Sequence, residues 1–262
     1  MSFKKPNELV DVFINTIGKN KTNYKIGQIF LLGLLAGVYI SFGALSALKS
    51  YSFIENHAIA SLLAGALFSV GLMLIIIGGG ELFTGNSLIL LSVMTKKVKV
   101  VSMLRNWLYV YLSNFLGALF IVFLIINSGL LYQGNDLNAI GETTVSIALQ
   151  KTHLTFSQAF IKGILCNWLV SLAVWLSLAS EDITGKILGI FFPIMTFVYL
   201  GFEHSIANMF IIPLGCVLSQ DVTLSGLIKN LIPVTLGNII GGSVFVGLFY
   251  FLTYNYYSKK TN

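Results

Sequence analysis

Two long apolar runs of this chain are each interrupted near their middle by a short polar stretch, at residues 79–86 and 201–208. Each stretch carries a glutamate five positions before an asparagine, at Glu81 and Asn86 in the first and at Glu203 and Asn208 in the second. Glycine-interrupted apolar segments at corresponding positions of two halves are typical of a binding site at the bilayer midplane. We therefore predict that the two segments form such a site on a transport pathway for a small solute.

The segments around these interruptions have the length and composition of membrane spans. Only 10% of the 262 residues are charged and 56% are hydrophobic, which is too little charge for a soluble domain. About 20 helical residues cross a hydrocarbon core, and the sequence has six apolar runs: 26–48, 58–78, 107–131, 154–179, 187–200 and 231–252. The second and fifth continue as 87–94 and 209–218. We predict an all-α membrane protein, 1–262, with six transmembrane helices in a single transport domain and with spans 2 and 5 broken.

The net charge of +6 is explained by orientation in a membrane rather than by nucleic-acid binding. If both termini lie on one side, that side holds 12 basic residues: Lys4, Lys5, Lys19, Lys21, Lys25, Lys96, Lys97, Lys99, Arg105, Lys186, Lys259 and Lys260. The other side holds Lys49, Lys151 and Lys229. Basic residues favour the cytoplasmic side, so we predict cytoplasmic N- and C-termini in the cell membrane. Residues 1–25 do not resemble a cleaved signal peptide and form a predicted cytoplasmic segment, and 132–153 form a predicted external loop.

The two halves of the chain also match outside the interruptions. Four residues of the first span recur in the fourth span 130 positions later. They are Gln28, Phe30, Gly33 and Leu35, which match Gln158, Phe160, Gly163 and Leu165. Around the third and sixth, the offset is 124 between Asn106, Asn114 and Gly117 and their partners Asn230, Asn238 and Gly241. These matches predict a 3+3 inverted repeat, approximately 26–131 and 154–254, because three spans bring the second copy in from the opposite side. The helices after the two interruptions then point their N-termini at the centre, which suits an anion.

Polar residues of the interruptions are candidates for the pathway. His204 lies at membrane depth, where ionisable side chains usually mark pathways, and it could donate a hydrogen bond or a proton; the alternative is a histidine that ties two helices together. Thr84 is placed to contact a passing ion or to cap the next helix. Glu81 and Glu203 would repel an anion, so we predict a structural role in which their carboxylates bind unwound backbone N–H groups. Asn86 and Asn208 are predicted to be structural at the same two breaks.

Two lysines on the fourth span leave alternatives open. Lys151 opens the span, where it could extend to lipid headgroups or attract anions into an outer vestibule. Lys162 lies deeper, and Leu32 stands at the matching position of the first half. A partner at a subunit interface and a role in conduction are equal alternatives for Lys162. The sequence has no His/Cys spacing typical of a metal site and no nucleophile motif, so we predict no catalytic residue, metal or cofactor.

Two motifs resemble the signatures of a known family. Ile77-Gly-Gly-Gly-Glu-Leu-Phe-Thr-Gly85 is similar to the first signature of the formate/nitrite transporter family. Gly163-Ile-Leu-Cys-Asn-Trp-Leu-Val-Ser-Leu-Ala173 is similar to the second, with Ser171 where cysteine is usual. The resemblance covers essentially the whole chain. It implies an aquaporin-like six-helix protomer, a homopentamer and one pore in each protomer.

The resemblance also implies roles for single residues. His204 corresponds to the central pore histidine, beside Thr84 and Asn167, and Lys151 corresponds to a vestibule lysine. Phe68 and Phe197 correspond to the outer constriction, and the inner constriction corresponds to Leu72, Leu82 and Phe83. Family members carry formate, nitrite, hydrosulfide or lactate, and the Cys-Asn-Trp-Leu-Val run of this chain looks most like nitrite-type members.

Desolvation limits how such an anion can cross. A bare anion in an apolar constriction is unfavourable by several kcal/mol, so temporary protonation would let the neutral acid cross; the alternative is an ion channel in which the charge itself crosses. We predict a channel or transporter for small monovalent anions of weak acids, nitrite or formate first and hydrosulfide next, linked to protons. A membrane enzyme or a sensor is the alternative from a different class, and no motif or attached signalling domain supports either.

Overall fold

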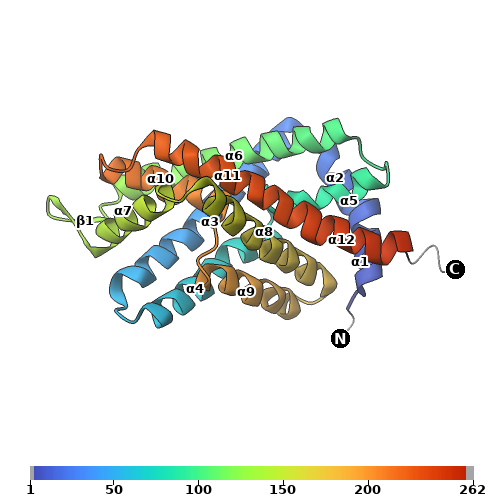
Figure 1. The fold of residues 1–262 in the computed structure, drawn as a ribbon, viewed down its shortest axis with the longest axis horizontal. Helices are drawn as coiled ribbons and strands as arrows, with labels where there is room; N and C mark the ends of the chain where they lie inside the picture. Colours follow the sequence, from blue (N-terminus) through green and yellow to red (C-terminus); the bar gives the residue numbers. More distant parts are fainter. Residues whose placement is uncertain (1–2, 258–262) are drawn as a thin grey trace.

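The computed structural model, which describes residues 3–257, is a bundle of long helices (Figure 1). Within that part, five helices are long and apolar enough to cross a membrane: α3 (Ile26–Phe53), α4 (His57–Gly78), α6 (Val100–Asn127), α8 (Phe156–Ala179) and the continuous helix Leu224–Tyr257. The remaining crossing, span 5, is made in two pieces, α9 (Ile183–Tyr199) and α10 (Ser205–Leu218). The predicted six spans are confirmed, and several helices extend beyond their apolar runs into flanking polar sequence.

Shorter elements complete the chain. Near its start lie α1 (Pro6–Val12), a π-helical turn (Phe13–Ile17) and α2 (Gly18–Asn23). After the first break come a 3-10 turn (Gly85–Ile89) and α5 (Leu90–Met94). The last long helix is composed of α11 (Leu224–Ile240), a π-helical segment (Gly241–Leu248), α12 (Phe249–Phe251) and a second π-helical segment (Leu252–Tyr257).

The segment predicted as an external loop is largely structured. It contains the hairpin of β1 (Tyr132–Gln133) with β2 (Asp136–Leu137), followed by α7 (Ala139–Thr152). Asn138 caps α7, because its Oδ1 accepts from the N–H groups of Ile140 and Gly141. Thr144 and Ala148 continue the buried face begun by Ile140 at a spacing of four residues, which is a helical period. The prediction of a loop was wrong because this face is short and lies within mostly polar sequence.

Both predicted breaks are present, and each begins beside a glycine with positive φ. Gly79 has φ +100° directly after α4, and Gly201 has φ +67° shortly after α9. Side chains with a Cβ rarely adopt these angles. Helical backbone is therefore lost at Gly79 and resumes with the 3-10 turn at Gly85, while the second break ends where α10 begins at Ser205.

Close helix packing follows the predicted repeat. A Cβ added to Gly117 on α6 would collide with the carbonyl oxygen of Leu34 on α3. In the second half, a Cβ added to Gly241 would collide with the carbonyl oxygen of Ile164 on α8. Small residues let membrane helices approach this closely. Two equivalent glycines thus bring the first and third span of each half into direct backbone contact.

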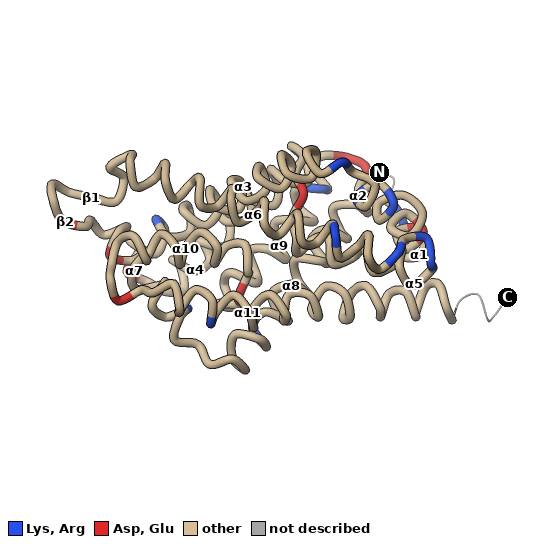
Figure 2. The backbone as a smooth tube through the Cα atoms, turned by 90° about the horizontal axis from the view of Figure 1, so that it is seen from above, with Lys and Arg blue, Asp and Glu red and all other residues tan. Residues whose placement is uncertain are grey.

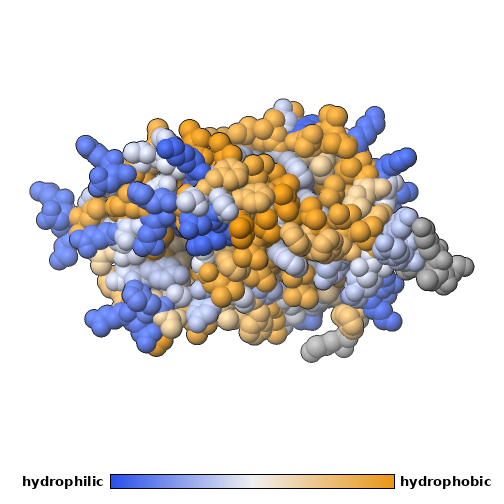
Figure 3. Space-filling view, viewed as in Figure 1, coloured by the Kyte–Doolittle hydropathy of each residue, from blue (hydrophilic) through white to orange (hydrophobic). Residues whose placement is uncertain are grey.

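The surface agrees with a protein that spans a membrane. Figure 3 shows a broad apolar band across the middle of the visible face and hydrophilic side chains toward both ends. Figure 2 shows Lys and Arg gathering at the end of the molecule that holds α1, α2 and α5. α1 packs against α12 and the segment Leu252–Tyr257, so the first and last helices share that end. Two basic residues in the predicted charge count, Lys259 and Lys260, lie outside the described residues.

Candidate functional site

The two breaks meet inside the bundle. Thr84, at the end of the first break, and His204, at the end of the second, lie 3.0 Å apart between Oγ1 and Nε2. Both side chains are buried, with 1% and 2% of their surface exposed. This polar contact therefore joins the two halves where both crossings lose their helical backbone.

His204 also caps the helix that follows it. Its Nδ1 accepts a hydrogen bond from the backbone N–H of Ala207, 3.2 Å away, at the N-terminus of α10. A ring nitrogen that accepts carries no proton, so this network assigns the proton of the neutral ring to Nε2. His204 then donates from Nε2 to the oxygen of Thr84. The Thr84 hydroxyl hydrogen is left to donate elsewhere.

Asn167 on α8 joins the same group, as the resemblance implied. Its Nδ2 donates to the backbone oxygens of Thr84 at 3.1 Å and Asn238 at 2.6 Å. Its Oδ1 is buried and has no hydrogen-bond partner among the described residues. Among the described residues, the Thr84 hydroxyl hydrogen and Asn167 Oδ1 are thus free for a further hydrogen bond, and the buried Ser205 Oγ beside His204 also has no partner. An unpaired buried acceptor is unfavourable, so a hydrogen-bond donor that reached Asn167 Oδ1 would stabilise it.

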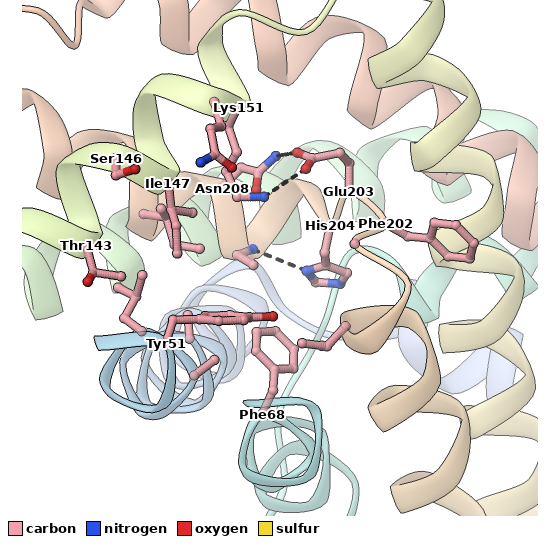
Figure 4. A pocket seen from close by; sticks show the side chains of 18 of the residues that line it. Tyr51, Phe68, Thr143, Ser146, Ile147, Lys151, Phe202, Glu203, His204 and Asn208 are labelled. Carbon is pink, nitrogen blue, oxygen red and sulfur yellow. Dashed lines mark hydrogen bonds and ion pairs between the residues drawn. The ribbon is translucent and has the colours of Figure 1, made fainter. Parts of the chain in front are cut away.

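Two cavities reach toward this centre from opposite ends of the bundle. The cavity beside α7, here the α7 vestibule, has a volume of about 720 Å³, and its lining includes Phe68, Lys151, Lys162, Phe197, Glu203 and His204. The cavity beside the N-terminal segment, here the N-terminal vestibule, has a volume of about 390 Å³, and its lining includes Lys21, Leu32, Leu72, Glu81, Leu82 and Asn86. Figure 4 shows Lys151 and Asn208 on one side of His204, with Tyr51 and Phe68 on the other.

Aromatic rings surround His204 on the side of the α7 vestibule. The ring of Phe197 stacks on the imidazole at 5.9 Å between centroids, and the ring of Phe68 meets it edge-on at 6.5 Å. The two phenylalanines contact each other edge-on at 5.4 Å. The residues of the implied outer constriction are therefore brought together above the histidine.

The residues of the implied inner constriction are only partly brought together. Leu72 and Leu82 are buried and line the N-terminal vestibule. Phe83 lines neither cavity, and its ring packs edge-on against Tyr111 at 4.9 Å and Trp107 at 6.1 Å. The position of Phe83 beside α6 gives it contacts in the bundle core.

Each break is flanked by a buried glutamate with a lysine and two asparagines. In the α7 vestibule, Glu203 accepts from Lys151 Nζ at 2.9 Å and from Asn208 Nδ2 at 2.6 Å, and Asn208 also donates to Asn230. The predicted structural role of the glutamate fits this geometry, but the predicted partner does not. The carboxylate binds an ammonium and an amide instead of unwound backbone N–H groups, because a buried carboxylate is stabilised most by an opposite charge.

The first half repeats this arrangement with the same residue types at the equivalent positions. Glu81 accepts from Lys21 Nζ at 2.6 Å and from Asn86 Nδ2 at 2.7 Å, and Asn86 donates to Asn106. Lys21 was not among the predicted site residues. A signal for it was present, since Lys21 and Lys151 differ by 130 positions, the same offset as Gln28 and Gln158.

The unwound backbone is held by a second pair of asparagines. Asn114 Oδ1 accepts from the N–H of Phe83, and its Nδ2 donates to the carbonyls of Gly33 and Glu81. Asn238 makes the equivalent three contacts in the second half, with Ser205, Gly163 and Glu203. The asparagine amide suits this position because it donates and accepts at once. These contacts fix the shape of both breaks.

The repeat fails at the centre of the pathway. At the offset of 122 that relates the two breaks, Leu82 stands where the second half has His204, and Ile206 stands where the first half has Thr84. The supporting lysines, glutamates and asparagines are conserved between the halves while the central polar pair is not. Within residues 3–257, no group of His, Cys, Asp and Glu side chains is arranged to hold a metal ion.

The whole-chain pattern agrees with known proteins. The sequence model described as formate/nitrite transporter matches residues 8–252. The chain belongs to the formate/nitrite transporter family. Among relatives, the formate channel BtFdhC of Bacillus thuringiensis is 39% identical over 257 residues, which cover 97% of this chain and 97% of that protein.

Two solved structures of similar proteins share the fold. A structure described as an FNT family ion channel has a TM-score of 0.84 at 31% identity and covers 93% of this chain and 99% of its own. A structure described as a pentameric formate channel with formate bound has a TM-score of 0.78 at 35% identity. The match covers 87% of this chain and 97% of that protein's chain. Family membership identifies the chain as a multi-pass membrane channel or transporter rather than an enzyme. The predictions of a membrane transport protein and of a function other than catalysis are both confirmed.

Proposed function

We propose that this chain is a formate channel of the cell membrane that assembles as a homopentamer with one pore in each subunit. The observation that carries the proposal is the buried Thr84–His204 contact between two vestibules. The relative from Bacillus thuringiensis is named a formate channel, and one similar structure is a pentameric formate channel with formate bound. Only 39–50% of the most apolar window of each long helix is buried within one subunit, which leaves faces for neighbouring subunits and lipid.

The α7 vestibule faces the outside in this proposal, and both termini are cytoplasmic. The basic end of the molecule holds α1, α2 and α5 (Figure 2), and basic residues favour the cytoplasmic side. The two inverted repeats, approximately 26–131 and 154–254, form one transport domain. Their mirrored asparagine and glutamate contacts support that assignment.

The pathway runs from the α7 vestibule past Phe68 and Phe197 to His204 and Thr84, and then past Leu72 and Leu82 to the N-terminal vestibule. A carboxylate among these apolar side chains would lose its hydration, which is unfavourable by several kcal/mol. A neutral acid avoids most of that loss. We therefore assign formic acid, formed from formate and a proton in one vestibule and separated again in the other, as the species that crosses the centre.

The hydrogen-bonding groups at the centre match a neutral acid better than an anion. The Thr84 hydroxyl is free to donate to a carbonyl oxygen, and Asn167 Oδ1 is free to accept from an acid O–H. A carboxylate has no proton to offer to Asn167. Since the Ala207 N–H occupies Nδ1 of His204, the histidine serves as a hydrogen-bond donor through Nε2, and the proton that travels with formate comes from vestibule water.

Flux through purified protein in liposomes tests this proposal. Formate should accumulate with the protein present, nitrite should compete with it, and sulfate should not, because its second charge increases the desolvation penalty and one proton cannot neutralise it. Stronger uptake of nitrite than of formate would favour the nitrite-type interpretation of the Cys-Asn-Trp-Leu-Val run. Absence of flux for all monovalent anions would overturn the proposal.

A further inference from the structure

The two vestibules have equivalent backbone contacts beside their breaks, but the side chains at one equivalent position differ in charge. The carbonyl of Leu32 accepts from the backbone N–H of Glu81 at 3.1 Å, and the carbonyl of Lys162 accepts from the backbone N–H of Glu203 at 3.3 Å. Leu32 lines the N-terminal vestibule, and Lys162 lines the α7 vestibule. The same backbone position beside each break therefore carries an apolar side chain in one half and a cation in the other.

Lys162 differs from the other vestibule lysines in having no anionic partner. Lys151 is paired with Glu203 and Lys21 with Glu81, so each of those pairs is close to electrically neutral. Among residues 3–257, no hydrogen bond or ion pair is made by the ammonium of Lys162. A partly buried ammonium without a partner is unfavourable. A small anion inside the cavity would supply that partner.

The remaining ionisable groups of the α7 vestibule do not neutralise Lys162. Glu142 also lines the cavity but is exposed in the first turn of α7. It lies nine residues before Lys151 on that helix, a rise of about 13 Å. His57 lies at the start of α4 and is exposed as well. Among the described residues no ion pair joins either group to Lys162, whose backbone carbonyl is bonded to the residue before His204.

We infer that Lys162 forms a second anion subsite in the α7 vestibule, which takes a small monovalent carboxylate or similar oxyanion before it reaches the centre. The inference rests on the proposed function as an anion pathway. Since Leu32 replaces the lysine in the N-terminal vestibule, the two entrances have unequal affinity. The α7 side collects anions at lower concentration than the N-terminal side does.

Replacement of Lys162 by the residue of the other half gives a direct test. Lys162→Leu should raise the half-saturation concentration for formate offered from the α7 side by roughly fivefold, which corresponds to about 1 kcal/mol. The value measured from the N-terminal side, and the rate at saturating formate, should stay near wild type. Lys162→Arg should keep the low value. The reverse change, Leu32→Lys, should lower the half-saturation concentration from the N-terminal side.

The two sides are separated by measuring uptake of labelled formate into intact cells and into inverted membrane vesicles at fixed pH. Lys229→Leu removes an exposed lysine from the same side without touching the cavity and is the matched control. The effect of Lys162→Leu should shrink at high salt, because screening weakens the attraction of the wild-type lysine. Equal half-saturation values for Lys162→Leu, Lys229→Leu and wild type would overturn the subsite.

A binding measurement keeps this inference separate from the proposed function. In purified protein, formate should slow acylation of Lys162 by a water-soluble amine reagent and leave the acylation of Lys229 unchanged, as read by peptide mass spectrometry. If wild type shows no formate flux but Lys162 is protected, the channel proposal fails and the subsite stands. If Lys162 is not protected, the subsite is overturned whether or not formate crosses.

Discussion

The ion pair of Lys151 with Glu203 gives the strongest single prediction. The Glu203 side chain is 5% exposed and the Lys151 side chain 15% exposed. Removing one partner of a buried pair costs about 3–5 kcal/mol, since the other charge is left unpaired. Asn208 still donates to the carboxylate at 2.6 Å, which places the expected loss for Lys151→Met at the lower end, about 3 kcal/mol.

The partner variant should behave differently. Glu203→Gln leaves a lysine whose flexible stem can bring its ammonium toward the water-filled vestibule, so we expect a loss of about 1 kcal/mol. In Lys151→Met/Glu203→Gln neither charge is left unpaired, and its stability should lie within about 1 kcal/mol of wild type. The double-mutant cycle then gives a coupling of roughly 3–4 kcal/mol. Denaturant titration of the purified protein in micelles measures each free energy of unfolding.

Transport in the same variants separates stability from attraction of the anion. The double variant should fold and carry formate at close to the wild-type rate, because two neutral side chains replace a pair whose charges cancel. Lys151→Ala should lose flux, because Glu203 is left with an unpaired negative charge that repels the anion, and Lys151→Arg should keep part of it. Lys229→Met serves as a control that loses one exposed lysine. Additive stability losses in the cycle would refute the buried ion pair. Wild-type flux in Lys151→Ala would instead favour the alternative in which Lys151 contacts lipid headgroups.

Three further predictions follow from the repeat, the topology and the centre. Gly117→Ala should destabilise the fold by about 1–3 kcal/mol, because its Cβ meets a backbone carbonyl that cannot move aside, as thermal unfolding would show; a stability equal to wild type would contradict the close approach. Single cysteines at residues 96–99 should resist an impermeant thiol reagent added to intact cells, and cysteines at 136–142 should react; the opposite pattern would overturn the topology. His204→Asn keeps a good N-cap for α10 but is too short to hold both Ala207 N–H and Thr84, so formate flux should fall with little loss of folded protein, whereas His153→Asn, on an exposed histidine, should match wild type.

Much of the fold was predictable from the sequence because it depends on local patterns. Apolar length predicts spans, and the interruptions at residues 79–86 and 201–208 predict the two breaks. The offsets between the halves predict which residues are equivalent. α7 was missed since its buried face, built on Ile140 and Ala148, spans only a few turns within polar sequence.

The site was predictable where the residue type itself is unusual. A histidine and a glutamate within apolar spans stand out, and both proved to lie at the breaks. The partners of the glutamates were not predictable, because Lys21 and Lys151 lie in flanking segments and reach Glu81 and Glu203 only after the bundle has folded. The free acceptor of Asn167 depends on which backbone oxygens its amide faces, and that also requires the structure.

The charge of the species that crosses the centre is the most direct test of the account. Formate uptake into liposomes is measured with the membrane voltage set by a potassium ionophore, across a series of external pH values. If neutral acid crosses, uptake should rise as external pH falls, by up to about tenfold per unit, and should respond little to voltage. One elementary charge moved across 100 mV is worth about 2.3 kcal/mol. A flux that follows voltage and is indifferent to pH would contradict passage of the neutral acid and show that the anion itself crosses.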